Sequence, residues 1–111
     1  MATEVDYVSG TASNADGAST ACIAAQGASY QTVLTDITLS NSSATAVEVV
    51  IKDGSTAKWT FPVPANTSGV VFNWVSGLVG TANTAWNFDQ SGTSNAITCS
   101  MSGYRKRIPG G

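Results

Sequence analysis

The chemistry open to this chain rests on its carboxylates, because the sequence holds seven acidic residues and no histidine. Without imidazole, neither a Ser-His-Asp nor a Cys-His nucleophile can form, and a histidine metal site is excluded as well. Two carboxylates can hydrolyse a glycosidic bond only when they share one cleft. The acids stand singly along the sequence, and only Asp36 and Glu48 could face each other on adjacent strands. We therefore expect no enzyme activity, no bound metal and no cofactor.

Two cysteines, Cys22 and Cys99, are the other reactive side chains. They stand too far apart for a CxxC site, and no histidine completes a zinc set. The first residues carry neither a basic segment nor an apolar run, so we expect no secretory signal and synthesis in a reducing compartment. No stretch approaches the ~18 apolar residues that span a membrane. The cysteines are interpreted as small strand residues, and whether they are bridged is left open.

Aromatic side chains could bind a ligand by stacking. Each of the three tryptophans stands two residues from a phenylalanine: Trp59 with Phe61, Trp74 with Phe72, and Trp86 with Phe88. In a strand, this spacing places both rings of a pair on one face, as in core or subunit-interface packing. A platform that stacks against a sugar is the alternative.

These side chains must be positioned by β-strands, and the segment from residue 30 to residue 63 defines them best. The stretch Tyr30–Leu39 alternates, with Val33, Ile37 and Leu39 expected on one face. A second alternating strand covers Thr45–Lys52. The following Asp-Gly pair predicts a tight type I′ hairpin turn into a third strand, which ends near two prolines.

The rest of the chain shows five further short strands between turn-forming segments. They are expected at Thr3–Ser9, Ala18–Ala25, Gly69–Val75, Ala85–Gln90 and Asn95–Tyr104. About eight strands at this spacing, with no convincing helix, predict an all-β, two-layer antiparallel β-sandwich. We expect a jelly-roll-like order, with an immunoglobulin-like order as the alternative.

The 111 residues are expected to form one domain. The sandwich covers residues 18–104, preceded by an N-terminal arm or edge strand at 1–17 and followed by a basic tail at 105–111. Charged residues make up only 11% of the chain and the formal net charge is −2, so no nucleic-acid partner is expected. The run Gly69–Val75 is apolar on both faces, which suggests an oligomer interface. The interface candidates are Val70, Phe72 and Trp74 on one face and Val71 and Val75 on the other.

Several segments in this order resemble small β-sandwich structural proteins of tailed phages, of the capsid decoration (cement) type. The segments are CIAA (22–25), LTDITLSNS (34–42), IKDG (51–54), WT (59–60), PA (64–65), GTANTA (80–85) and SGY (102–104). The resemblance covers about residues 18–104. It implies a homotrimer on the outer surface of the virion head, made in the host cytoplasm and bound to the major capsid protein.

The expected function is therefore a virion structural protein, a decoration protein that stabilises the head by bridging capsid subunits. Its capsid contacts are expected at the two ends of the chain, through Tyr7, Arg105, Lys106 and Arg107. The alternative is a tail or fibre module that recognises a host-surface glycan through Trp59, Trp74 and Trp86.

Overall fold

The computed structural model of the chain describes residues 6–15, 17–92 and 96–109, and these residues form strands, turns and loops with no helix. No helix long and apolar enough to cross a membrane is therefore present in the described ranges. Eight strands are present there: β1 Asp6–Asn14, β2 Thr20–Ile23, β3 Tyr30–Asn41, β4 Val47–Asp53, β5 Thr56–Val63, β6 Thr67–Val79, β7 Trp86–Gln90 and β8 Ile97–Arg107.

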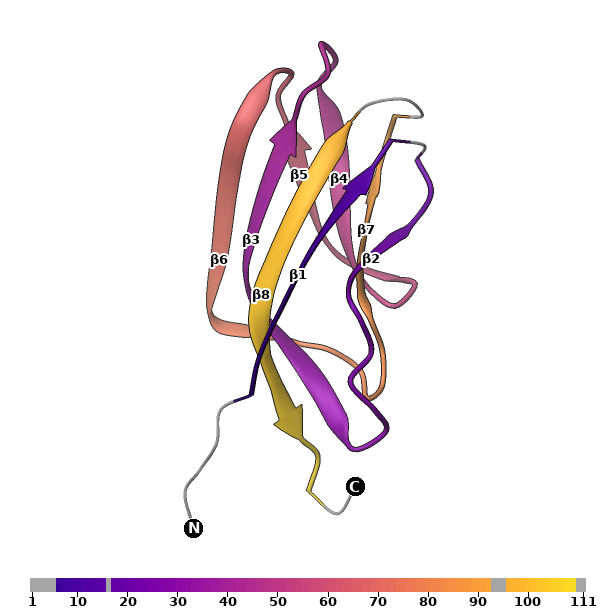
Figure 1. Cartoon of the computed structure of the whole chain (residues 1–111), viewed down its shortest axis with the longest axis vertical. Helices are drawn as coiled ribbons and strands as arrows, with labels where there is room; N and C mark the ends of the chain where they lie inside the picture. The colour runs from indigo at the N-terminus through magenta and orange to yellow at the C-terminus, as the bar shows by residue number, and fades with distance from the viewer. Residues whose placement is uncertain (1–5, 16, 93–95, 110–111) are drawn as a thin grey trace.

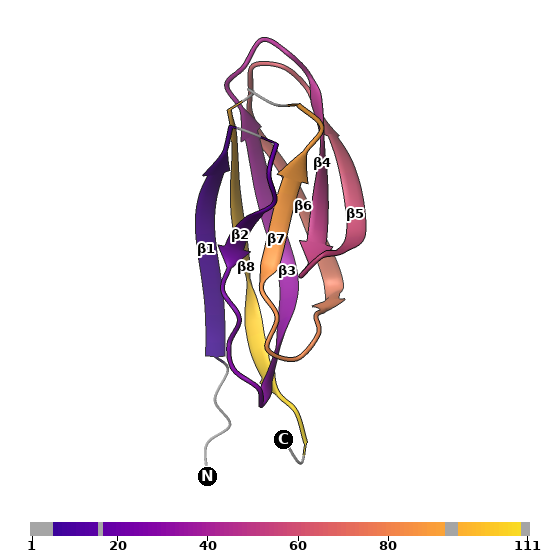
Figure 2. The ribbon, with the colours of Figure 1, turned by 90° about the vertical axis from the view of Figure 1, so that its right-hand side faces the viewer.

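The strands form two four-stranded antiparallel sheets that pack face to face (Figures 1 and 2). Sheet A has the order β1-β8-β3-β6 and sheet B the order β2-β7-β4-β5. The chain crosses between the sheets at every connection except β4 to β5, which is a hairpin, and its first and last strands lie side by side. This is the strand order of a jelly roll; an immunoglobulin sandwich divides its strands differently. The predicted all-β sandwich is confirmed, and the jelly-roll order is the one observed.

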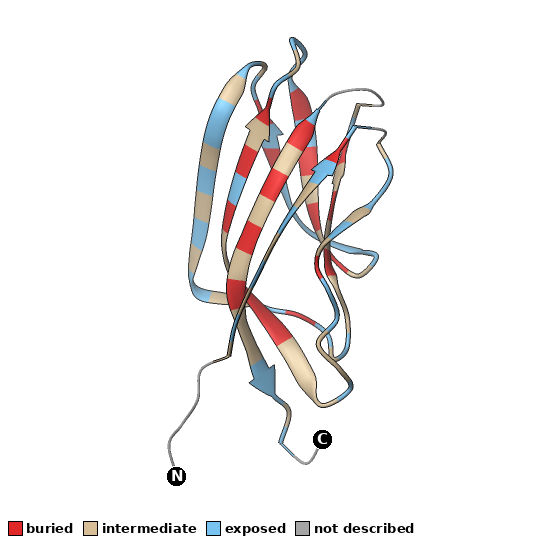
Figure 3. Ribbon diagram, viewed as in Figure 1, coloured by how far each residue is buried: buried red, intermediate tan, exposed pale blue. Residues whose placement is uncertain are grey.

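The core lies between the sheets and follows from the alternation of the strands. Along β4, Val47, Val49 and Ile51 are buried, while the residues between them are not. The same pattern runs along β8, where every second residue from Ile97 to Gly103 is buried, as the red bands in Figure 3 show. Alternation of this kind places one face of each strand against the opposite sheet.

One strand departs from simple alternation. In β3 the pairing shifts register between Leu34 and Asp36, toward both β8 and β6. Toward β8 the extra residue is Thr35, whereas toward β6 the extra residues lie on β6, between Asn73 and Leu78. The phase of β3 changes at Thr35, so Leu34 and Ile37 both enter the core cluster. The prediction that Val33 shares a face with Ile37 and Leu39 is wrong: Val33 is fully buried but lies outside that cluster, and a Cβ added to Gly77 of β6 would lie 2.4 Å from its Cγ1.

The two sheets lie closer together on one side of the sandwich than on the other. At the β1–β2 side the backbones approach so closely that a Cβ on Gly10 would lie 1.8 Å from the carbonyl oxygen of Cys22. At the β5–β6 side, aromatic rings separate the sheets. Phe61 stacks on Phe72 with ring centroids 3.7 Å apart. The space between the sheets is therefore wedge-shaped: small residues fill its narrow β1–β2 side, and aromatic rings fill its wide β5–β6 side.

The strand ends differ from the expected ones at several places. β8 continues to Arg107, so its predicted end at Tyr104 is wrong; the backbone of residues 105–107 pairs with Thr32, Gln31 and Tyr30 of β3. β1 covers Asp6–Asn14 at the edge of sheet A and so continues past the predicted strand end at Ser9. Residues 1–5, 110 and 111 of the predicted arm and tail lie outside the described residues.

Candidate functional site

The two acids that could have shared a cleft lie in different sheets. Asp36 belongs to β3 of sheet A, and Glu48 belongs to β4 of sheet B, where it pairs with Pro62 and is exposed. The prediction that they could face each other on adjacent strands is wrong, because the jelly-roll order separates β3 from β4. Among the described residues, no three His, Cys, Asp or Glu side chains gather as a metal site would require.

Asp53 has a structural role at the end of β4. Its carboxylate is buried and accepts three hydrogen bonds from Thr81, two from the backbone N–H at 3.1 and 3.0 Å and one from the hydroxyl at 2.7 Å. These bonds anchor the loop between β6 and β7. A buried carboxylate satisfied in this way holds the loop in place.

The tryptophans divide into one core residue and two at the β5–β6 side. Trp86 is 1% exposed, and its indole N–H donates to the carbonyl oxygen of Thr32 at 3.0 Å. It cannot stack against a sugar, so its place in the predicted glycan platform is wrong. Trp59 is 46% exposed, and its ring meets that of Trp74 edge to face at a centroid distance of 5.9 Å.

The outer surface of β6 carries exposed apolar side chains. Val70, Phe72 and Trp74 are half-buried and pack toward the core, whereas Val71 is 65% exposed and Val75 is fully exposed. Figure 3 shows β6 with intermediate and exposed residues and no buried one. We call Val71, Val75 and the outer edge of β6 the β6 surface. The structure places the five interface candidates on this strand and splits them between its two faces.

The β6 surface is an open sheet edge. β6 pairs with β3 on one side, and no strand among the described residues pairs with its other side. None of its 13 residues, from Thr67 to Val79, is charged. Proteins ordinarily protect exposed edge strands with charged residues or prolines against pairing with other chains. This edge lacks that protection.

The basic residues at the end of β8 are not equivalent. The Arg105 guanidinium donates to the Asp6 carboxylate, with Nε and Oδ2 2.9 Å apart, and stacks over the Tyr30 ring at 4.3 Å. It therefore joins β1, β3 and β8. Lys106 and Arg107 are exposed and open to a partner. Three basic residues were predicted to contact the capsid. Within the described structure, the Arg105 side chain makes contacts inside the protein, whereas the side chains of Lys106 and Arg107 have no such contact.

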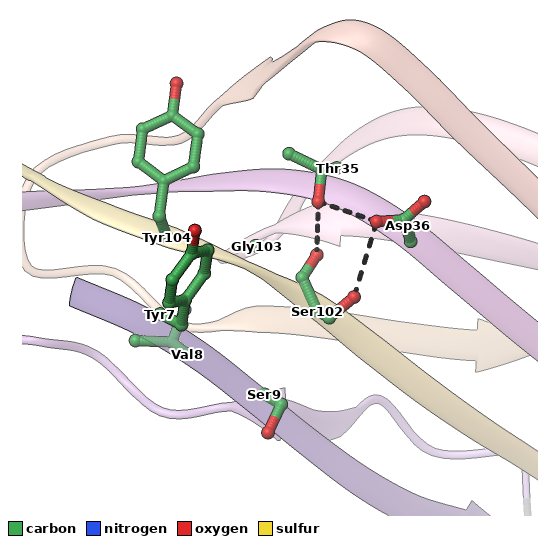
Figure 4. A pocket seen from close by; sticks show the side chains of 8 residues that line it. All are labelled: Tyr7, Val8, Ser9, Thr35, Asp36, Ser102, Gly103 and Tyr104. Atoms are coloured by element: carbon green, nitrogen blue, oxygen red, sulfur yellow. Dashed lines mark hydrogen bonds between the residues drawn. The ribbon is translucent and has the colours of Figure 1, made fainter. Parts of the chain in front are cut away.

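A shallow groove lies on the outer face of sheet A, across β1, β8 and β3 (Figure 4). Its volume is ≈ 370 Å³. Tyr7 and Tyr104 are direct partners in the β1–β8 pairing, and their rings rise from the same face. Asp36 lies at the other side of the groove, beside Ser102. The sequence pointed to Tyr7 as a capsid contact and to Asp36 only as a possible partner of Glu48. It did not point to Tyr104 or to this grouping, because only the strand order brings these residues together.

The two cysteines lie together between the sheets and are not bridged. The Cys22 thiol lies 3.2 Å from the carbonyl oxygen of Gly10 and 3.3 Å from that of Cys99. A hydrogen bond from the Cys99 thiol lowers the pKa of Cys22, and the same pairing together with burial raises the pKa of Cys99. Cys22 is therefore the first of the two to ionise.

We expect this asymmetry to appear in alkylation. Because the thiolate is the nucleophile, Cys22 should react with iodoacetamide in the folded protein at a lower pH than an ordinary thiol. Cys99 is fully buried and should react only in denaturant. Peptide mass spectrometry after labelling with and without urea measures both sites, and a Cys22→Ser variant identifies the early adduct. Equal labelling of both cysteines in the native state would contradict the assignment.

The fold defines an all-β jelly-roll sandwich whose exposed features are an unprotected edge and a groove on one face. No family model matches the chain, and neither does any curated protein. Among solved structures, it is similar to the cyanophage Pam1 capsid asymmetric unit, with 12% sequence identity and a TM-score of 0.42. The alignment covers 90% of this chain and 84% of that chain. A likeness at this level does not indicate a function.

Proposed function

We propose that this protein is a structural component of a tailed-phage virion, and more specifically a capsid decoration protein that stabilises the head by bridging capsid subunits. The observation that carries the proposal is the β6 surface: an uncharged edge strand with exposed Val71 and Val75. Exposed apolar side chains beside unpaired backbone groups favour association with another chain. The motifs that resemble phage decoration proteins support the proposal that the associating chains belong to a virion.

In this proposal the protein acts by adhesion. A homotrimer forms through the β6 surface, where each copy covers the apolar edge of its neighbour. The far end of β8 presents Lys106 and Arg107, and the start of β1 lies beside it because Asp6 pairs with Arg105. Tyr7, also exposed, follows on β1. This end would contact acidic surface of the major capsid protein on the outside of the head, and the added buried area would raise the barrier to rupture of the shell.

Capsids test the function directly. Heads stripped of this protein should rupture at a lower temperature than complete heads, and adding the purified protein back should restore the original temperature. Release of packaged DNA, followed with an intercalating dye during heating, measures rupture. An unchanged rupture temperature after stripping would refute the stabilising role.

The β6 surface can be tested separately by introducing charge. A Val71→Asp, Val75→Lys variant should change the free energy of unfolding by no more than about 0.5 kcal/mol per site, because both side chains point to solvent. Its mass by sedimentation should fall from a multiple of the chain mass to the 11.3 kDa of a single chain. An Ala24→Lys variant, exposed beyond β2, is the control and should retain the wild-type mass. A wild-type protein that sediments as a monomer would contradict this interface.

A further inference from the structure

The groove on the outer face of sheet A combines two tyrosine rings with a carboxylate that can accept hydrogen bonds from a ligand. Tyr7 is 82% exposed, an unusual position for a large ring on a surface otherwise rich in small hydroxyl side chains. It stands directly opposite Tyr104 on the neighbouring strand. The phenol groups of both residues form no hydrogen bond with the described residues, so the faces and hydroxyls of the rings are available to a ligand.

The polar side of the groove is organised by the bulge in β3. The Thr35 hydroxyl donates to Oδ2 of Asp36 at 2.9 Å and lies 3.1 Å from the backbone oxygen of Ser102 (Figure 4). The Ser102 hydroxyl approaches the same Oδ2 at 3.5 Å. Oδ1 of Asp36 accepts no hydrogen bond from the described residues. The bulge therefore fixes a carboxylate by one oxygen and leaves the other open; bulges often re-aim side chains in this way next to binding sites.

The tyrosine pair and the Asp36 carboxylate lie side by side on the outer face of sheet A. Ser9, Ser102 and Asp36 form a row across β1, β8 and β3, and this row stands two residues along the strands from the tyrosine pair. Two residues of a strand correspond to about 7 Å. The groove volume of ≈ 370 Å³ falls within the usual range for small-molecule sites.

A hexose matches this arrangement. Its ring offers a C–H face that packs on an aromatic ring, and its hydroxyls can donate to an open carboxylate oxygen and exchange hydrogen bonds with serine and threonine hydroxyls. An organic cation would also suit tyrosine and aspartate. However, exposed Lys106 follows Tyr104 by two residues on the same face of β8, which disfavours a positive ligand.

We propose that this groove is a glycan-binding site in which Tyr7 and Tyr104 stack on one hexose unit and Oδ1 of Asp36 accepts hydrogen bonds from its hydroxyls. The inference does not rest on the proposed capsid function: the two share Tyr7, but neither the β6 surface nor Lys106 and Arg107 line the groove. It replaces the tryptophan platform expected from the sequence with a tyrosine one.

Saturation-transfer difference NMR on the full chain tests the site with glucose, galactose, mannose, N-acetylglucosamine and choline as separate probes. A single-sugar site is expected to bind with a Kd of about 1 mM. We expect transfer to the ring protons of at least one of the four sugars. Tyr7→Ala should weaken binding at least about tenfold, which corresponds to about 1.4 kcal/mol. Tyr7→Phe should retain binding, and Asp36→Asn should weaken it.

The controls keep the result interpretable. Tyr7 is so exposed that Tyr7→Ala should fold normally, and its urea midpoint checks this. Thr11→Ala, on the same strand and face outside the groove lining, should bind like the wild type. Absence of transfer to all four sugars, undiminished transfer in Tyr7→Ala, or stronger transfer to choline than to any sugar would overturn the proposal. The sedimentation and capsid experiments are unaffected by any of these outcomes.

Discussion

Replacement of Gly10 by alanine should lower the free energy of unfolding by about 3 kcal/mol or more. The added Cβ would lie 1.8 Å from the carbonyl oxygen of Cys22 and 2.9 Å from its carbonyl carbon. Both are backbone atoms of β2, and β1 is itself fixed by its pairing with β8. Neither strand can move away without breaking hydrogen bonds or opening the thin side of the wedge. Urea unfolding followed by circular dichroism measures the loss.

Gly69→Ala is the matched control for this prediction. Gly69 also lies in a strand, but a Cβ at this position meets nothing within 4 Å. Its φ is not positive, so alanine fits the backbone, and the change in stability should stay within about 1 kcal/mol in either direction. If the two substitutions had equal effects, the close approach of β1 and β2 would not determine stability.

Local patterning predicted the β4–β5 hairpin well because these two strands are neighbours both in the sequence and in sheet B. The hairpin between β4 and β5 is present where Asp53 and Gly54 indicated it. Its turn differs from the predicted type I′, since Asp53 pairs with Thr56 and of the two central residues only Gly54 has a positive φ, of 64°. Glycine at the first central position is the requirement of a type II′ turn.

Other features depend on contacts that the sequence pattern does not contain. The expected strand ended at Val75, yet β6 continues past Gly77 to Val79, and the positive φ of Gly77 lets the backbone pass over Val33. The change of phase at Thr35 is visible only in the pairing of β3 with its two neighbours. A strict alternation of period two cannot predict a bulge in a central strand.

The groove was the least predictable feature. Tyr7 and Tyr104 are 97 positions apart in the sequence, and they meet because a jelly roll pairs its first strand with its last. Asp36 joins them only because β3 is the next strand in the same sheet. Single residues of ordinary types, with no motif between them, therefore form a site through topology alone. By contrast, the apolar run of β6 was visible in the sequence, because its exposed and half-buried residues belong to one continuous segment.

Trp86→Ala should be the most damaging core substitution, with a loss of about 3–5 kcal/mol in the free energy of unfolding. The side chain is among the largest that are fully buried, and it lies at the start of β7 against the β6–β7 connection, where a Cβ on Gly80 would be 3.1 Å from its Nε1. Removing the indole would leave a cavity and loosen the loop that Asp53 anchors through Thr81. Urea unfolding monitored by near-ultraviolet circular dichroism measures the effect.

A second substitution separates packing from hydrogen bonding at this position. Trp86→Phe retains most of the ring volume and removes the N–H that donates to Thr32. The Thr32 carbonyl oxygen would still accept a hydrogen bond from the backbone N–H of Gly80 at 2.9 Å. The loss in the free energy of unfolding should therefore be smaller, about 1–2 kcal/mol. Trp59→Ala, whose ring is partly in solvent, should cost less than Trp86→Ala. If Trp59→Ala were the more destabilising of the two, the stability of the sandwich would depend on the aromatic side of the wedge instead of on the buried indole.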